Sequence, residues 1–332
     1  MHTPVTRTTR EIKKNNVVLV VNALKALTSA TKAELALQTG LSVATCGTVL
    51  NALCQSGEVM ALTQDVSSGG RPAQRFACNP AFFSLLSLYV EGTAEESRMV
   101  ACVTSATGET QEKWDVHFTH LTSAQFTDAI ADILARYPAV RAVGIGLPGV
   151  IADGVVLNCD IPMFIGLPLT QKLHEQFGLF VEVGNDMNYT AWGFYRNSCP
   201  QETAPIAYIL QPGGHCTGCG IVINGRVLQG ASHFAGEVSE LPLSLQAEEP
   251  ITSQLAKIVM SLVAVINPAT VALSGPMLGQ ASLSAIARQC LEHFPQQHLP
   301  QLVYRDSIEQ DYLTGITELT LENFQRQRIF TD

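Results

Sequence analysis

The chain has 332 residues, of which 46% are hydrophobic and 15% are charged, and its formal net charge is −9. This length predicts two or three folded domains with sizeable cores, and the composition excludes a disordered or fibrous protein. No apolar run reaches the roughly 18 residues that a membrane-spanning helix needs, so we expect no span.

The N-terminus and the cysteines favour a cytoplasmic protein. The first stretch, MHTPVTRTTREIKKNN, lacks the apolar segment of a secretory signal. The nine cysteines are odd in number and are scattered along the chain. Such usage suits a reducing compartment better than a disulfide framework.

The charge is distributed unevenly. Residues 1–79 carry eight Lys or Arg and four Asp or Glu, whereas the remaining residues carry twelve and twenty-five. A basic segment ahead of an acidic body predicts that the N-terminal part meets a polyanion such as DNA. The alternative is a chance imbalance in a short segment.

The basic segment also shows a helix-turn-helix pattern. Apolar residues recur at helical spacing over residues 17–27, which predicts a first helix. Thr31 followed by Glu34 is typical of a capping box, and Gly40 is placed to end a second helix. Ser42 is then placed to cap a third helix. Two helices joined by a short glycine-containing turn indicate a helix-turn-helix.

A wing is predicted after these helices. The segment EVMALTQDVSSGGRPAQRFACNP has the pattern of two short strands joined by a polar loop. Gly69, Gly70 and Pro72 favour a tight tip beside Arg71, and an Arg at such a tip is well placed to enter a minor groove. The alternative is a three-helix module with no role in DNA binding.

The third helix has no basic side chain, because no Lys or Arg occurs between Lys32 and Arg71. Its hydroxyl and amide groups can touch bases or phosphates, but they release no counterions. We expect operator DNA as the partner, bound by a homodimer or a dimer of dimers. The candidate DNA-binding residues are Ser42, Thr45, Thr48, Asn51, Arg71 and Lys32.

The rest of the chain, from about Pro80, predicts an α/β body of two lobes. Strand pairs are followed by alternating helices and strands, and this order occurs twice. A cleft between the lobes is the expected ligand site. We place the winged helix-turn-helix at 1–79, lobe 1 at 80–190 and lobe 2 at 191–311, with a C-terminal helix at about 312–330 returning to lobe 1.

Four motifs of this body resemble those of a known family. In order, they are GIGLPGVI, VEVGNDMNYTAWG, GIVINGRVLQGASHFAGEVSEL and INPATVALSG. Preceded by a winged helix ending in GRP, they resemble the ROK family of bacterial sugar kinases and sugar-responsive repressors. The resemblance covers about residues 12–320. It implies a two-lobed, actin-like (ribonuclease H-like) ATPase fold for the body.

The resemblance also implies a sugar site. Asn185 and Asp186 stand where the family's Asn-Asp pair grips sugar hydroxyls, and in the kinases this Asp is the general base. Glu237 stands where a family Glu takes two hydroxyls, and Asp160 where the family often has an Asn contacting sugar. Glu240 replaces a family histidine, either as a hydroxyl acceptor or as a solvated side chain. Equally, Asn185 and Asp186 fit a helix N-cap, and Glu237 fits a solvated loop carboxylate.

Both phosphate loops and the zinc motif depart from the family pattern. The first loop, YVEGTAEES, has no Asp before its glycine, and the second carries His215 and Cys216 where a kinase has Thr and Gly. The family's zinc-binding His and cysteine run are missing. A metal or redox site at His215, Cys216 and Cys219 lacks a fourth ligand in sequence. We therefore expect no metal, no cofactor and no catalysis, with Asp186 as a vestigial base.

These observations predict a sugar-responsive, DNA-binding transcriptional regulator of carbohydrate metabolism, expected to be a repressor. Its body would bind a sugar or sugar phosphate without phosphorylating it. Two alternatives stay open. One is an ATP-dependent sugar kinase of the ROK family with an added DNA-binding domain, and the other is a regulator whose body only oligomerises.

Overall fold

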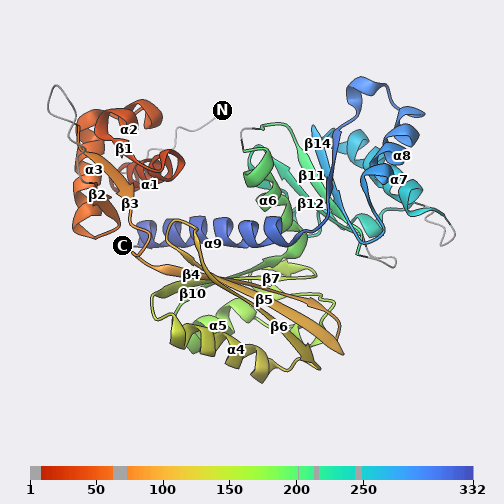
Figure 1. The fold of residues 1–332 in the computed structure, drawn as a ribbon, viewed down its shortest axis with the longest axis horizontal. Coiled ribbons are helices and arrows are strands. Elements are labelled where there is room, and N and C mark those ends of the chain that lie inside the picture. Colours follow the sequence, from red (N-terminus) through yellow and green to blue (C-terminus); the bar gives the residue numbers. More distant parts are fainter. Residues whose placement is uncertain (1–8, 63–72, 201, 213–216, 244–248, 332) are drawn as a thin grey trace.

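The computed structural model describes residues 9–62, 73–200, 202–212, 217–243 and 249–331. The chain has an α/β fold with mixed sheets (Figure 1). Arg71, His215 and Cys216, which the sequence singles out, lie outside the described residues. None of the described helices is long and apolar enough to cross a membrane.

The N-terminal module packs its helices on an antiparallel sheet of order β1–β3–β2. The predicted caps are confirmed: Thr31 and Glu34 form a capping box, Gly40 adopts the left-handed conformation, and Ser42 accepts a hydrogen bond from the Thr45 N–H. Its elements are α1 (Thr9–Leu27), β1 (Ala30–Thr31), α2 (Lys32–Thr39), α3 (Val43–Gln55), β2 (Val59–Ala61) and β3 (Arg75–Cys78).

Lobe 1 is built on a mixed sheet of order β10–β7–β4–β5–β6. Strands β4, β7 and β10 are parallel, and β5 and β6 are antiparallel to their neighbours. Helices α4 and α5 cover one face, and α9 crosses the other (Figure 1). The elements are β4 (Ser84–Gly92), β5 (Glu96–Ser105), β6 (Thr110–Thr119), α4 (Ser123–Arg136), β7 (Val140–Leu147), β8 (Ile151–Ala152), β9 (Val155–Val156), η1 (Pro162–Phe164), α5 (Leu169–Phe177) and β10 (Phe180–Asn185).

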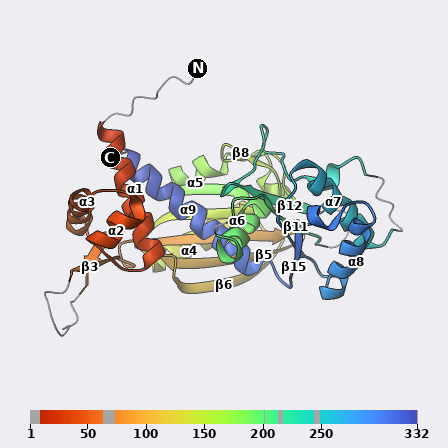
Figure 2. The same ribbon diagram turned by 90° about the horizontal axis from the view of Figure 1, so that it is seen from above.

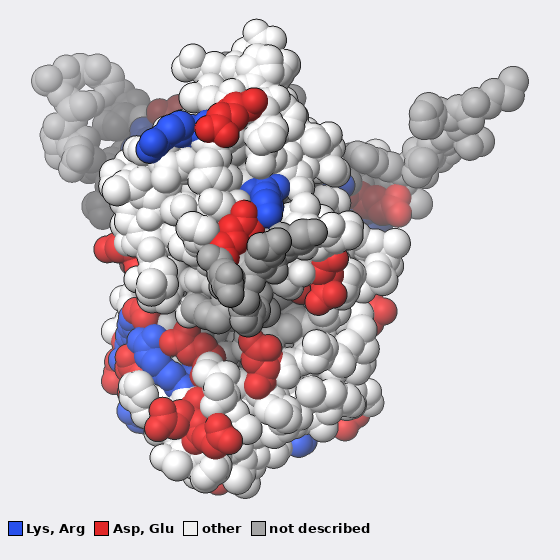
Figure 3. Space-filling model, turned by 90° about the vertical axis from the view of Figure 1, so that its right-hand side faces the viewer, with Lys and Arg blue, Asp and Glu red and all other residues white. Residues whose placement is uncertain are grey.

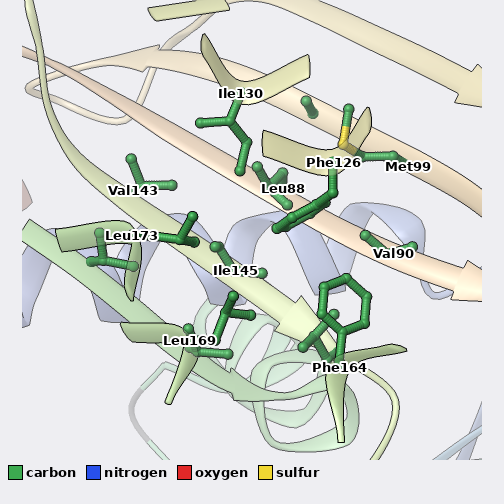
Figure 4. Close-up of a cluster of buried hydrophobic side chains, with 14 of the residues drawn as sticks. Leu88, Val90, Met99, Phe126, Ile130, Val143, Ile145, Phe164, Leu169 and Leu173 are labelled. Atoms are coloured by element: carbon green, nitrogen blue, oxygen red, sulfur yellow. The ribbon is translucent and has the colours of Figure 1, made fainter. Parts of the chain in front are cut away.

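The core of lobe 1 lies between this sheet and its two covering helices (Figure 4). Leu88 and Ile145 project from adjacent strands, and Phe126 and Ile130 descend from α4. Phe126 meets Phe164 edge-on, with ring centroids 5.1 Å apart. These contacts hold the carboxyl ends of β7 and β10 in place.

Strand β6 differs from the sequence-based expectation, which passes directly from β5 to α4. Its burial alternates between exposed and half-buried residues, and only Trp114, Val116 and Phe118 pack against the core. An edge strand with a charged outer face has a weak hydrophobic pattern.

Lobe 2 is a second mixed sheet, of order β13–β12–β11–β14–β15, packed against α7 and α8. Two further helices, α6 and α9, join it to lobe 1. The elements are α6 (Asp186–Ser198), β11 (Ile206–Leu210), β12 (Gly218–Ile223), β13 (Arg226–Val227), η2 (Val238–Glu240), α7 (Ile251–Val265), β14 (Thr270–Ser274), α8 (Gln280–Leu291), η3 (Gln296–His298), β15 (Gln301–Arg305) and α9 (Glu309–Thr331).

Helices α6 and α9 cross in contact between the lobes. A Cβ at Gly193 of α6 would overlap the carbonyl oxygen of Asp311, and a Cβ at Gly315 of α9 would overlap that of Tyr189. The two backbones therefore touch, which only glycine permits. This crossing sets where α6 begins.

The C-terminal half of α9 reaches the N-terminal module (Figures 1 and 2). The Lys25 ammonium on α1 donates to the Gln325 side chain at 3.1 Å, and Arg328 forms an ion pair with the buried Glu58. The first and last helices are thus tied together. The module is attached to the element that also carries the lobe crossing.

We predict that Gly193→Ala destabilises the protein by on the order of 3 kcal/mol, because the added methyl group must separate α6 from α9. Gly279→Ala is the matched control, since a Cβ there has no neighbour within 4 Å. Its expected cost is about 1 kcal/mol or less. Urea unfolding followed by circular dichroism gives both values, and equal midpoints for the two variants would contradict the crossing.

Candidate functional site

The candidate site lies where β10 ends and α6 begins. Asn185 is the last residue of β10, paired with Leu147 of the parallel strand β7, and Asp186 is the first residue of α6. The carboxyl ends of parallel strands in an open α/β sheet are the usual position of a ligand site. The fold therefore brings Asp186 to the opening between the lobes.

Asn185 has a structural role that the sequence left open as an alternative. Its side-chain oxygen accepts from the Asn188 N–H at 2.8 Å, which makes it the N-cap of α6. Its amide donates to the Gly149 carbonyl at 2.8 Å and to the Asp186 carboxylate at 2.9 Å. Asn185 therefore holds the 149 turn and orients Asp186.

Asp186 is the most strongly perturbed carboxyl group of the site. Burial raises its pKa to about 7, the hydrogen bond from the Met187 N–H opposes this, and the charges of Asp160 and Glu237 raise it further. A carboxyl group with a pKa near neutrality exchanges its proton readily at physiological pH. Such a perturbed group in a cleft is a candidate catalytic residue.

The other acidic residues of the predicted sugar site lie around Asp186. Burial raises the pKa of Asp160, and burial followed by the charges of Glu240 and Asp160 raises that of Glu237. Asp160 and Glu240 are exposed, and Glu237 is half-buried. The structure thus brings all four acids into one electrostatic cluster.

This cluster is suited to a ligand that donates hydrogen bonds. Ionised carboxylates only accept, so a molecule with several hydroxyl groups can satisfy them at once. Gly149, at a φ of 147°, forms the turn beside the cluster, and a Cβ there would overlap the Asn158 carbonyl. A tight turn leaves room next to Asp186. The arrangement favours a polyhydroxylated ligand.

A buried pair of tyrosines joins β4, in the first hairpin of lobe 1, to α9. Tyr89 and Tyr312 stack with ring centroids 4.5 Å apart, and the Tyr312 ring fills the space above Gly146. Burial, and then the charge of Asp186, raises the pKa of Tyr312 well above its ordinary value. The Tyr312 hydroxyl has no hydrogen-bond partner among the described residues. The sequence alone does not indicate this contact, because the two tyrosines are 223 positions apart.

Arg98 gathers acidic residues at the mouth of the same hairpin. It forms ion pairs with Glu91 at 2.8 Å, Asp115 at 2.7 Å and Glu309 at 2.9 Å, and Lys113 also pairs with Glu309. Figure 3 shows acidic and basic residues side by side on the lower part of this end of the molecule. The network ties the start of α9 to β5 and β6.

The predicted DNA-binding residues separate into three groups. Ser42, Thr48 and Asn51 are exposed on α3, although the Thr48 hydroxyl donates to the Ala44 carbonyl. Thr45 and Lys32 are half-buried, and the Lys32 ammonium lies 5.8 Å from the centroid of the Phe76 ring. The third group is Arg71, outside the described residues.

Arg75 is one of the basic residues of the N-terminal segment. Its guanidinium pairs with Glu34 at 3.3 Å and donates to the Ser29 carbonyl at 2.8 Å. Part of its charge is therefore already neutralised within the module.

Metal binding has no support among the described residues. They contain no group of three or more His, Cys, Asp and Glu side chains with the geometry to hold a metal ion. Cys219 is buried, and burial, followed by the charge of Glu237, raises the pKa of its thiol to about 12. A thiol that stays protonated is a poor metal ligand and a poor nucleophile.

Comparison with known proteins gives a family and two kinds of relative. The ROK family model matches residues 96–249. A protein of Vibrio cholerae serotype O1 named N-acetyl-D-glucosamine kinase is 31% identical over 130 residues, which is 37% of this chain and 42% of that protein. One of Salmonella arizonae with the same name is 30% identical over 39% of this chain and 44% of its own length. The chain thus spans less than half the length of these curated relatives.

Solved structures extend the likeness of fold over the whole chain. A ROK family transcriptional regulator, described as a homologue of the E. coli MLC protein, has a TM-score of 0.75 at 18% identity and covers 97% of this chain and 100% of its own. A putative N-acetylmannosamine kinase from Listeria monocytogenes has a TM-score of 0.61 at 16% identity, over 73% of this chain and 100% of its own.

These comparisons correct two expectations. The sequence relatives are named as kinases, so they contradict the expectation of a regulator that does not phosphorylate its ligand and the expectation of a non-enzyme. They favour the kinase alternative. The altered phosphate loops therefore do not exclude the kinase alternative. The ROK family model therefore matches part of the chain, and the solved ROK structures share its fold.

Proposed function

We propose that the chain is a sugar kinase that transfers the γ-phosphoryl group of ATP to a hydroxyl group of its substrate. The relatives named N-acetyl-D-glucosamine kinase support an N-acetylated hexose as the substrate class. The chain matches less than half of each of these relatives, so the substrate is carried over as part of the proposal.

The observation that carries this proposal is the pKa of Asp186. Burial raises it to about 7, so at neutral pH about half of these carboxyl groups are ionised. A general base is most effective when its pKa lies close to the working pH. Because Asp186 begins α6, the helix dipole still favours its ionised form.

The proposed step uses residues already described. Asp160, Glu237 and Glu240 accept hydrogen bonds from the sugar hydroxyls and fix the orientation of the sugar. Asp186 takes the proton of the acceptor hydroxyl while the oxygen of that hydroxyl forms a bond to the γ-phosphorus. The bond between the γ-phosphorus and the oxygen that bridges it to the β-phosphate breaks, and ADP leaves. Positioning and charge neutralisation supply most of the rate in such transfers.

The metal ion that accompanies ATP belongs to that substrate, and the described residues contain no group of three or more acidic, His or Cys side chains that could hold a further metal ion. Asn185 orients the base through its 2.9 Å hydrogen bond.

DNA is a second proposed ligand, through the N-terminal module. Helices α2 and α3 are separated by the Gly40 turn, and α3 leaves Ser42, Thr48 and Asn51 exposed. The whole-chain likeness to a ROK transcriptional regulator supports this reading. Phosphate and base contacts of these side chains would be made by a pair of modules in a dimer.

We predict that Asp186→Asn lowers kcat by about 10²–10⁴-fold, because the amide cannot accept the hydroxyl proton. The measurement is ADP release with MgATP and N-acetylglucosamine, with urea unfolding as the control for folding. Asn188→Ala is the matched control on the first turn of α6, because the cap of this helix uses only the backbone N–H of Asn188. Equal turnover by Asp186→Asn and the parent protein would rule out Asp186 as the base.

The activity should depend on pH in a defined direction. Ionised Asp186 is the active form, so kcat/KM, which reports the free enzyme, is expected to rise with pH through a midpoint at about 7 and then level off. The charge of Glu237 raises that pKa, so Glu237→Gln should move the midpoint to lower pH. A midpoint that stays in place or moves upward in this variant would contradict the electrostatic coupling.

DNA binding should respond to charge on the exposed face of α3. We predict that Thr48→Glu weakens binding of a random-sequence duplex by about tenfold or more at low salt, because the new carboxylate faces phosphates. Ser284→Glu on the exposed face of α8 adds the same charge to lobe 2 and should leave affinity within about twofold. Fluorescence anisotropy of the full chain measures both, and similar effects of the two variants would exclude α3 as the DNA face.

A further inference from the structure

A cavity of about 540 Å³, the Arg141 cavity, lies at the amino ends of β7 and β10. Helix α5 ends at Gly178 in the left-handed conformation, and the chain turns directly into β10. Phe180 of β10 pairs in register with Ala142 of β7, so Arg141 reaches the same end of the sheet. Asp186 follows the other end of β10, which is about 17 Å away at roughly 3.3 Å per residue. The cavity is therefore separate from the acidic cluster.

Part of the cavity wall is aromatic. The rings of Phe180 on β10 and Phe324 on α9 both line it, with their centroids 5.6 Å apart. The Phe324 ring also meets Phe83 edge-on at 5.1 Å, so packing fixes its position. Leu179 and Val181 add apolar surface beside the rings. A planar apolar group is suited to this wall, because aromatic rings pack favourably against one another.

Arg141 provides a fixed set of hydrogen-bond donors at this cavity. Its Nη1 donates to the Pro138 carbonyl at 2.7 Å and to the Val140 carbonyl at 2.9 Å. Its Nε and Nη2 have no hydrogen-bond partner or ion pair within the part of the chain that the structure describes. Two adjacent N–H groups of a guanidinium can pair with both oxygens of one carboxylate. Because the backbone contacts already hold the guanidinium, little side-chain freedom is lost when an anion binds.

The charge of the lining favours a single negative charge on the ligand. Among the described residues, the lining includes Arg141, Arg328 and His174 but no Asp or Glu. Arg328 is paired with Glu58, which balances its charge. The His174 Nδ1 donates to the Leu179 carbonyl at 2.7 Å and so closes the turn after α5. Arg141 therefore supplies one unbalanced positive charge, which a monoanion matches and a phosphate dianion exceeds.

We propose that the Arg141 cavity binds a small aromatic monocarboxylate. The ring of the ligand packs against Phe180 and Phe324, and its carboxylate accepts hydrogen bonds from Nε and Nη2 of Arg141. The volume of about 540 Å³ lies in the usual range for small-molecule sites. None of these residues takes part in the proposed phosphoryl transfer, so this site goes beyond the proposed function and does not depend on it.

The first probe is para-fluorobenzoate, whose binding to the full chain is followed by fluorine NMR relaxation. The second probe is para-fluorobenzyl alcohol, which has the same ring without the charge. We expect saturable binding of para-fluorobenzoate, and an affinity for the alcohol that is lower by about tenfold or more, because hydrogen bonds to a charged group are the stronger ones. Acetate, which has the charge without the ring, is expected to compete only at much higher concentration than unlabelled benzoate.

Arg141→Gln is the charge variant, and it is expected to weaken para-fluorobenzoate binding by about tenfold or more, because the paired donors are lost. Arg141→Lys keeps the charge without the paired donors and should recover only part of the affinity. Arg288→Gln is the matched control: Arg288 is exposed on α8 of lobe 2 and does not line the cavity, so binding should be unchanged.

Phe180→Leu tests the aromatic wall and is expected to weaken para-fluorobenzoate binding by about threefold. Its matched control is Phe118→Leu, which removes a half-buried ring from β6, outside the cavity. Urea unfolding checks that all five variants are folded.

Three results would overturn the proposal. They are no saturable binding of para-fluorobenzoate, equal affinity for the acid and the alcohol, and binding that both Arg141 variants leave intact. Phosphoryl transfer is measured in parallel and should be unchanged in Arg141→Gln, since Arg141 lies at the opposite end of the sheet from Asp186. Failure of the kinase proposal would thus appear as absent turnover in the parent protein, whatever the NMR titration reports.

Discussion

The close crossing of α6 and α9 is the contact on which the rest of the structure depends. Gly193 and Gly315 let the two backbones touch, and no other residue can replace either without moving a helix. Because α6 begins directly at the end of β10, the crossing fixes the depth at which Asp186 enters the cleft. One helix thus carries the proposed base on its first turn and the contact with α9 two turns later.

The carboxylates of the acidic cluster repel one another, and a bound substrate can reduce this repulsion. Asp160, Glu237 and Asp186 carry like charges, and no Lys or Arg of the described residues forms an ion pair with any of them. Without a ligand, repulsion and burial keep the pKa of Asp186 high. Hydroxyl donors that satisfy Asp160 and Glu237 would lower that repulsion, which ties the ionisation of the base to the presence of the sugar. In a site of this kind, the proposed base is most fully ionised when the substrate is bound.

Local signals were readable from the sequence, and long-range ones were not. The Thr31 capping box and the Ser42 cap each depend on residues within a few positions, and both are found as expected. Strand β6 was missed because its outer face is charged. The Arg98 network, the Tyr89–Tyr312 stack and the Arg141 cavity join residues from distant parts of the chain, so no spacing in the sequence marks them. The placing of Asp160, Asp186 and Glu237 rested on family resemblance, and their roles stay proposals.

The mistaken expectation of a non-enzyme has a physical explanation. That expectation took His215 and Cys216 as obstacles to phosphate binding. Phosphate is held largely by backbone N–H groups, and their direction depends on the loop conformation more than on each side chain. Charge around the phosphates also comes from distant residues brought together by folding. A general base, by contrast, needs one specific group in one place, and the proposed base Asp186 lies at the N-terminus of α6 with a pKa that burial raises to about 7. Retention of the group with the strictest positional requirement therefore carries more information about activity than the loss of groups that other parts of the fold can replace.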